Sequence, residues 1–160
     1  MIRKFVLAAA LLAPVSVVAQ ELPTAPYLPL DMAQTVAGAA LDACAAQGYS
    51  VSVAIVARSG VTKVILRADN AGPHTVGSSR GKAFTSASMG RDTAGLAAFI
   101  GGNPQNDGLR DMDSRLVIQA GGLPIRVGGA LVGGVGVGGA PSGDIDATCA
   151  RAGLDAIGAD

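Results

Sequence analysis

Apolar residues recur every three or four positions in two separate parts of the chain, which is the spacing of a helix that buries one face. The first part begins at Asp31 and ends before Gln47-Gly48, and the second closes the chain after the polar run at 142–146. Their apolar positions are Met32, Val36, Ala39, Ala40, Ala43 and Cys44 in the first part, and Ala147, Cys149, Ala150, Leu154 and Ile157 in the second. We therefore predict a first and a last helix.

The segments that follow the first helix are rich in β-branched residues and predict strands. Residues 49–58 and 61–68 flank the two-residue turn Ser59-Gly60, which is typical of a β-hairpin. Residues 116–119, 123–127 and 130–138 predict three more strands, the last two joined by a turn at Gly128-Gly129. The pattern thus predicts five strands.

Two further helices are predicted between the hairpin and the later strands. Gly72-Pro73 opens a helical segment that runs through Ser88, and Asp92 or Thr93 can cap a short helix before Gly101-Gly102. Helices that flank a mainly antiparallel sheet of five strands make an α+β fold. We expect the first and last helices to share one face of that sheet.

The N-terminus has the organisation of a secretory signal peptide over residues 1–19. Arg3 and Lys4 precede a short apolar run, and small residues at 17–19 provide a cleavage site. The apolar run is too short to span a bilayer, and we expect no transmembrane anchor. We expect a periplasmic or secreted protein, with residues 20–30 as a proline-rich extended arm and 31–160 as one domain.

Charge and cysteine content narrow the picture further. Loss of the signal peptide leaves ten basic and twelve acidic residues, a balance that gives no electrostatic reason to bind nucleic acid. Export would place Cys44 and Cys149 in a compartment that permits a disulfide. The two cysteines meet if their helices share a sheet face. The alternative is a pair of separate buried thiols.

His74 is the single histidine of the chain, and it stands where the helix carrying Arg80, Lys82 and Phe84 is predicted to begin. A neutral imidazole is a good ligand for haem iron or another metal, so His74 is a candidate ligand. Arg80 and Lys82 lie within two helical turns of it and could approach carboxylates such as haem propionates. The alternatives are a surface or capping histidine and two solvated helix charges.

The chain resembles the GlcG/HbpS-like haem-binding domains, a bacterial family often called haem-degrading, over nearly all of its length after Asp31. The resemblance rests on the order and spacing of Val51-Ser52-Val53-Ala54-Ile55-Val56, Gly60, Arg67-Ala68-Asp69-Asn70-Ala71, Arg80-Gly81-Lys82-Ala83-Phe84-Thr85, Gly121-Gly122-Leu123-Pro124-Ile125, Gly133-Gly134-Val135-Gly136-Val137-Gly138-Gly139 and the ending 144–157. It implies a profilin-like sandwich that forms homo-oligomers and binds haem or a related tetrapyrrole. The chain departs from the family pattern at Ala57, commonly Asp, and at Gly138, commonly Ser.

The resemblance also bears on the candidate site. It implies a structural or ligand role for Lys82, within the family's Lys-Ala-aromatic-Thr motif that includes Phe84, and it favours His74 as an axial ligand of haem iron. The second axial ligand would be absent, water or a residue of another subunit. Met89 is a weaker candidate, because a methionine at this spacing is more often part of a core.

Other chemistries fit the sequence poorly. The G-x-G-x-x-G spacing at 134–139 lies too close to the C-terminus for a dinucleotide-binding unit. The pairs Asp111/Asp113 and Asp144/Asp146 lack the spacing and terminal Glu of an EF-hand loop, and we interpret Asp144 as a helix cap. A zinc centre has too few nitrogen ligands, and serine hydrolase chemistry is poorly supported because His74 is the single histidine that could serve as its base.

The sequence therefore predicts an exported protein that binds haem and stores, transports or senses it, with catalysis left open. One alternative is an oligomeric assembly module without a ligand. The other is an enzyme, either haem-degrading or acting on a small molecule of glycolate or corrinoid metabolism, which rests on analogy of fold alone.

Overall fold

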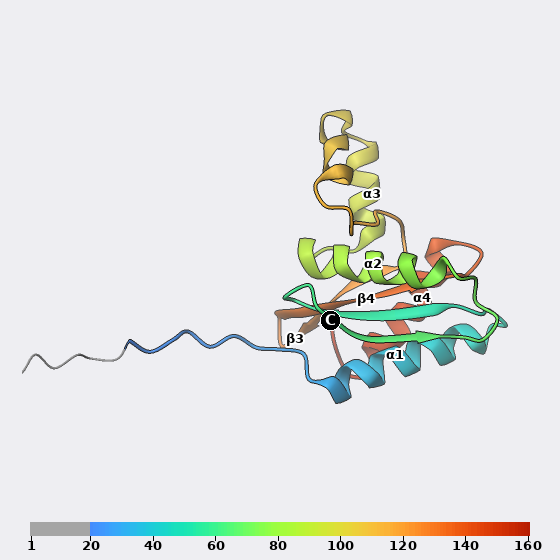
Figure 1. The fold of residues 1–160 in the computed structure, drawn as a ribbon, viewed down its shortest axis with the longest axis horizontal. Helices are drawn as coiled ribbons and strands as arrows, with labels where there is room; N and C mark the ends of the chain where they lie inside the picture. The colour runs from blue at the N-terminus through green and yellow to red at the C-terminus, as the bar shows by residue number, and fades with distance from the viewer. Residues whose placement is uncertain (1–19) are drawn as a thin grey trace, which may run out of the picture.

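A four-stranded sheet with helices on both faces forms the body of the protein in the computed structural model, which describes residues 20–160 (Figure 1). The predicted signal peptide at 1–19 lies outside the described residues. In chain order the elements are α1 (Leu30–Ala45), β1 (Ser52–Ala57), β2 (Thr62–Arg67), α2 (Thr75–Met89), α3 (Thr93–Gly101), the 3-10 helix η1 (Pro104–Asp111), β3 (Gly122–Val127), β4 (Ala130–Gly138) and α4 (Gly143–Asp155). The predicted α+β class and both hairpins are confirmed.

The strands lie in the order β2-β1-β4-β3, and every neighbouring pair is antiparallel. The prediction of a fifth strand at 116–119 is wrong. This segment crosses α2 instead, where the amide of Val117 donates a 2.9 Å hydrogen bond to the Thr85 hydroxyl. A side-chain partner on a helix thus replaces the ladder hydrogen bonds that a strand would need.

Helices α1 and α4 cover one face of the sheet and enclose the larger part of the core (Figure 1). Cys44 of α1 and Cys149 of α4 form a disulfide with a Cα–Cα distance of 5.5 Å, which confirms the predicted pairing. Gly153 lets the two helices approach, because a Cβ there would lie 2.6 Å from the Val36 carbonyl oxygen. The bridge therefore joins elements that already pack closely.

Helix α2 covers the other face and packs directly on the backbone of β4. A Cβ on Gly134 or Gly136 would overlap backbone atoms of α2, and a Cβ on Gly138 would lie 3.0 Å from the Ser78 hydroxyl. Any larger residue along this strand would push the helix away from the sheet. The glycines of the G-x-G-x-x-G spacing thus form a packing surface for α2. This agrees with the sequence argument against a dinucleotide site.

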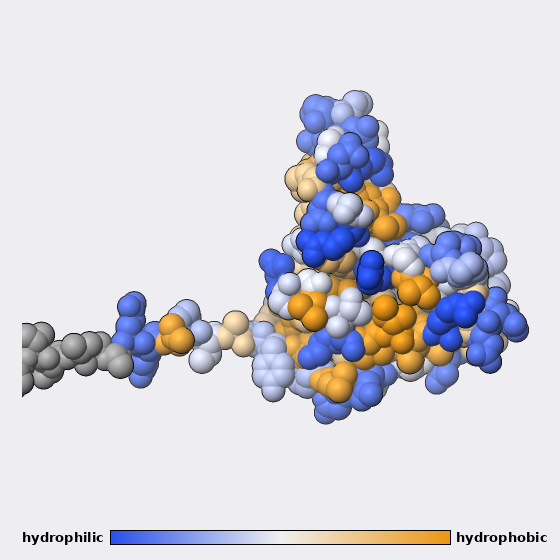
Figure 2. Space-filling model, in the orientation of Figure 1, coloured by the Kyte–Doolittle hydropathy of each residue, from blue (hydrophilic) through white to orange (hydrophobic). Residues whose placement is uncertain are grey.

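Two segments extend from this body. Helix α3 and η1 form a projection beyond α2 (Figure 1), and its outer end is covered mainly by hydrophilic side chains (Figure 2). Asp92 caps α3 by accepting a 2.6 Å hydrogen bond from the Gly95 amide, one of the two capping residues predicted. Residues 20–27 form an exposed extended arm, which enters the body at the buried Leu28.

Candidate ligand pocket along helix α2

Helix α2 carries the predicted site residues but divides them between two cavities. His74 and Lys82 line a cavity of about 320 Å³, whereas Arg80 and Phe84 line another of about 430 Å³. Successive residues of an α-helix are turned by about 100°, so Arg80 and Phe84 share one side of α2 and Lys82 lies on the opposite side. One copy of the chain therefore does not bring all four side chains to one cavity.

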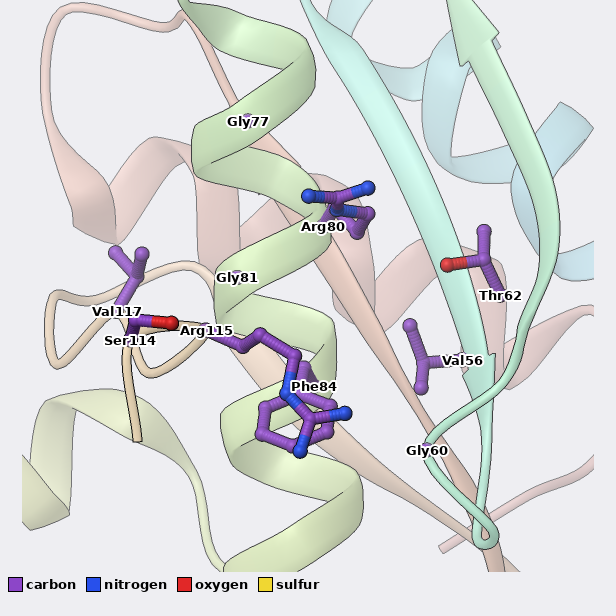
Figure 3. Close-up of a pocket in the computed structure, with 10 residues that line it drawn as sticks. All are labelled: Val56, Gly60, Thr62, Gly77, Arg80, Gly81, Phe84, Ser114, Arg115 and Val117. Carbon is purple, nitrogen blue, oxygen red and sulfur yellow. The ribbon is translucent and has the colours of Figure 1, made fainter. Parts of the chain in front are cut away.

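The cavity at Arg80 and Phe84, here called the α2 pocket, lies between α2, the β1–β2 hairpin and the segment that precedes β3 (Figure 3). Glycines on the hairpin and on α2 keep it open, since a Cβ at Gly60 would lie 3.1 Å from the Phe84 ring. Its lining residues are Val56, Gly60, Thr62, Gly77, Arg80, Gly81, Phe84, Ser114, Arg115 and Val117. The pocket combines apolar walls with two guanidinium groups.

Arg115 is the pocket residue that sequence reasoning missed. Its guanidinium carbon lies 4.1 Å from the centroid of the Phe84 ring, a cation–π contact visible at one end of the pocket in Figure 3. Asp113 also holds the guanidinium, accepting hydrogen bonds of 2.9 Å from Nε and 2.6 Å from a terminal nitrogen. No local sequence motif indicates this contact, because Arg115 lies 31 positions after Phe84 in the chain.

The electrostatics of the pocket mouth follow from this pair. The side-chain hydrogen bonds from Arg115 lower the pKa of Asp113 from its ordinary value of 3.8 to about 2. The same interaction raises the pKa of Arg115. Both groups are therefore charged at neutral pH. Asp113, one of the paired aspartates that could offer oxygens to a cation, instead pairs with an arginine.

His74 stands at the position that precedes α2, with its side chain exposed and making no capping hydrogen bond. Its ring lies beside Gly72, where a Cβ would meet the ring carbon Cε1 at 2.7 Å. Within residues 20–160, neither ring nitrogen has a hydrogen-bond partner. Met89 ends the same helix, so roughly 22 Å of helix separates the two residues, and one chain cannot place both on one iron.

Lys82 is buried beneath the His74 cavity, with a side-chain exposure of 2%. Its Nζ lies 2.8 Å from Asp146 Oδ2 and 3.0 Å from the Val137 carbonyl oxygen. Asp146 Oδ1 in turn accepts a 3.1 Å hydrogen bond from the Ala140 amide. The sequence left a structural role and a ligand role open for Lys82. These contacts are those of a structural role.

The cap of α4 differs from the sequence prediction. Ser142 is the capping residue, and its hydroxyl accepts a 3.3 Å hydrogen bond from the Ile145 amide. Asp144 lies in the first helical turn, where its charge favours the positive end of the helix dipole. The prediction of Asp144 as the cap is therefore wrong, and several side chains in the run 142–146 are of a type that can cap a helix.

Other kinds of site find no support in the part of the chain that the structure describes. Residues 20–160 contain no group of three His, Cys, Asp or Glu side chains arranged to hold a metal ion. Within the same range, no helix is both long and apolar enough to cross a membrane.

Comparison with known proteins places this fold in a family. Residues 28–155 match the family described as haem degrading protein, HbpS-like. A crystal structure of a double mutant of HbpS from Streptomyces reticuli is 42% identical, with a TM-score of 0.80 over 91% of this chain and 97% of that chain. No curated protein sequence matches the chain.

Two more distant structures share the fold. Klebsiella pneumoniae protein ORFY is 26% identical, with a TM-score of 0.80 over 89% of this chain and 98% of that chain. A structure described as a complex of PduOC with heme is 25% identical, with a TM-score of 0.77 over 84% and 98% of the two chains. The family match covers most of the chain, from the buried end of the arm to the last helix. The protein therefore belongs to the HbpS-like family of haem-degrading proteins.

Proposed function

We propose that this protein is exported and binds haem, which it stores, transports or senses. Membership of the HbpS-like family supports haem as the ligand, and so does the fold shared with a structure described as a heme complex. When bound, haem supplies an iron centre that takes axial ligands and exchanges electrons. The protein's part is to bind the group, orient it and control what reaches the iron.

The single observation that carries the proposal is the composition of the α2 pocket. Haem has a flat apolar ring and two carboxylates, so a site for it needs apolar walls and cationic groups. The pocket supplies Val56, Phe84 and Val117 for the ring edge and Arg80 and Arg115 for the carboxylates. Its volume of about 430 Å³ lies in the range of small-molecule sites. These residues fit the group.

His74 remains our candidate axial ligand, and its place outside the α2 pocket shapes the proposal. Its exposed imidazole has no partner among residues 20–160 and is free to coordinate. Because His74 and the α2 pocket belong to different cavities of one chain, we propose that His74 reaches the iron from a neighbouring copy. The site would then lie between subunits of a homo-oligomer.

Hemin titration of the chain from residue 20 onward tests the ligand role. We expect the wild-type protein to give a shifted and sharpened Soret band, and His74→Ala to change the band position and weaken binding. Gln105→Ala is the matched control, because Gln105 is an exposed polar residue on the projection. An identical band and affinity in wild type and His74→Ala would exclude the histidine as ligand.

Subunit mixing tests whether the site is shared between copies. His74→Ala and Arg115→Ala would each damage one half of such a site. Co-expression of the two variants then produces some sites that take His74 from one copy and Arg115 from another, both intact. We expect hemin binding with the wild-type band to return in part. Binding no better than the average of the separate variants would contradict a shared site.

The family description makes degradation the second candidate. Incubation of the hemin complex with a reductant in air distinguishes the two functions. A binding protein keeps its Soret band, whereas a degrading enzyme loses it and releases biliverdin and iron. A protein that is colourless when purified and also ignores hemin would instead be an assembly module.

Export is supported by the charged and apolar pattern of residues 1–19 and by the compartment that a disulfide requires. Fractionation of cells that express the full chain tests it. We expect a protein shortened by about 19 residues in the periplasm or medium, and full-length protein in the cytoplasm would contradict export.

A further inference from the structure

We propose that Arg115, held in place by Asp113, makes the α2 pocket select tetrapyrroles by their free carboxylates. Arg115 and Arg80 bind the two carboxylates, and Asp113 acts as a positioning residue. This inference rests on the proposed function and adds the chemical feature that the pocket recognises.

The orientation of Arg115 is the first step of the argument. The Phe84 ring supports one face of its guanidinium at 4.1 Å, and Asp113 accepts hydrogen bonds from Nε and one terminal nitrogen. A guanidinium has five N–H groups, so these bonds leave donors on the terminal nitrogens. The side chain is 58% exposed, and a ligand can reach those donors. A long side chain that is already fixed loses little entropy when it binds a carboxylate.

The second step is the charge of the pocket lining. Arg80 lines the same pocket from α2 and forms no ion pair within residues 20–160. None of the ten lining residues is acidic, and the hydroxyls of Thr62 and Ser114 add two neutral donors. Arg80 therefore has no competing carboxylate inside the pocket. The arrangement suits a ligand with more than one anionic group on an apolar frame.

A second arginine–aspartate pair lies on the projection, outside the α2 pocket, and provides a comparison for Arg115 and Asp113. Arg110 also pairs with an aspartate, Asp107, at 3.0 Å, but it lies on η1 and lines neither cavity of α2. Both arginines are exposed to solvent, at 43% for Arg110 and 58% for Arg115. Arg110 is therefore the matched control for loss of an exposed, paired arginine.

The test compares hemin with hemin dimethyl ester, which has the same ring and iron but no carboxylates. Both are titrated into each protein from one solvent stock, followed by the Soret band. For the wild type we expect the ester to bind about tenfold more weakly, the size expected for losing two partly exposed charge-assisted contacts. The ratio of the two dissociation constants should fall toward one in Arg115→Ala, and should stay at the wild-type value in Arg110→Ala.

Two further variants separate binding from positioning. Arg115→Lys keeps the charge but not the planar fork, so we expect a ratio between those of wild type and Arg115→Ala. Asp113→Asn keeps the arginine but weakens its clamp, and we expect a reduced ratio with Arg115 still present. A role in folding alone would change the binding of both ligands equally and leave the ratio unaltered.

The outcomes separate this inference from the proposed function. If hemin and its ester bind the wild type equally well, or if Arg115→Ala keeps the full ratio, carboxylate selection is overturned while haem binding stands. If neither ligand binds the wild type, the proposed function fails and the inference falls with it.

Discussion

Removing one partner of the buried ion pair between Lys82 and Asp146 should destabilise the fold strongly. The side chains are 2% and 4% exposed, and 2.8 Å separates their charged atoms. Replacement of Asp146 by asparagine keeps the size of the side chain but removes its charge. Lys82 would then keep the Val137 carbonyl as its remaining partner among residues 20–160. A buried ammonium group without a counter-charge is strongly unfavourable.

The expected magnitude follows from that burial. Removing one partner of a buried pair destabilises proteins by about 3–5 kcal/mol, because the other charge is left uncompensated. The folded state of a typical domain is stable by only about 5–15 kcal/mol, so Asp146→Asn should lose a large fraction of the total. The hydrogen bond from the Ala140 amide should contribute little to this loss of stability, since the asparagine oxygen can still accept it.

Urea denaturation at neutral pH, followed by far-ultraviolet circular dichroism, measures the difference. Asp144→Asn is the matched control, because Asp144 is an exposed acid in the first turn of the same helix. It removes the same helix-dipole interaction without uncovering a buried charge. The double variant Lys82→Met/Asp146→Leu should recover much of the stability. If Asp146→Asn and Asp144→Asn unfold within about 1 kcal/mol of each other, the buried-charge argument is refuted.

Three other changes have defined outcomes. Cys44→Ser/Cys149→Ser opens a loop with a sequence separation of 105, and should lose up to about 4.7 kcal/mol of unfolding free energy by urea titration. Gly136→Ala places a methyl group against the α2 backbone and should lose about 1–3 kcal/mol or more, whereas Gly38→Ala, with open space around it, should lose nothing. The lowered pKa of Asp113 means that its pairing contributes fully above pH 3.8 and fades as the pH falls toward about 2. Carboxyl NMR should therefore give a midpoint near 2, and a midpoint near 3.8 would contradict the clamp.

Elements with a strong local signal could be predicted from sequence. The hairpins and α1 follow from apolar spacing and glycine turns within each segment, and Asp92 follows from cap chemistry. The prediction of a strand at 116–119 is wrong because four residues are too few to show an alternation of apolar and polar positions. The path of this segment depends instead on a tertiary contact to Thr85. Its apolar residues serve α2 instead of a sheet edge.

The candidate site was predictable only in part, because its contacts join distant segments. The sequence placed Arg80 and Phe84 on one helix, and the structure puts both at the α2 pocket. Arg115 and its contact to Phe84 depend on how the segment before β3 returns across the helix. The ion pair of Lys82 with a residue 64 positions later has the same origin. Sequence identifies such groups as charged, and only the fold assigns their partners.

The division of α2 between two cavities is a consequence of how closely this helix approaches the sheet. The glycines of β4 let the backbone of α2 pack directly on the strand, so one face of the helix is buried against the sheet. The cavity lined by His74 and Lys82 lies at the start of α4, and the cavity lined by Arg80 and Phe84 lies at the β1–β2 hairpin. Neither cavity of a single copy is lined by residues of both sets. This division is the reason that we propose a site shared between subunits, and the subunit-mixing experiment tests it.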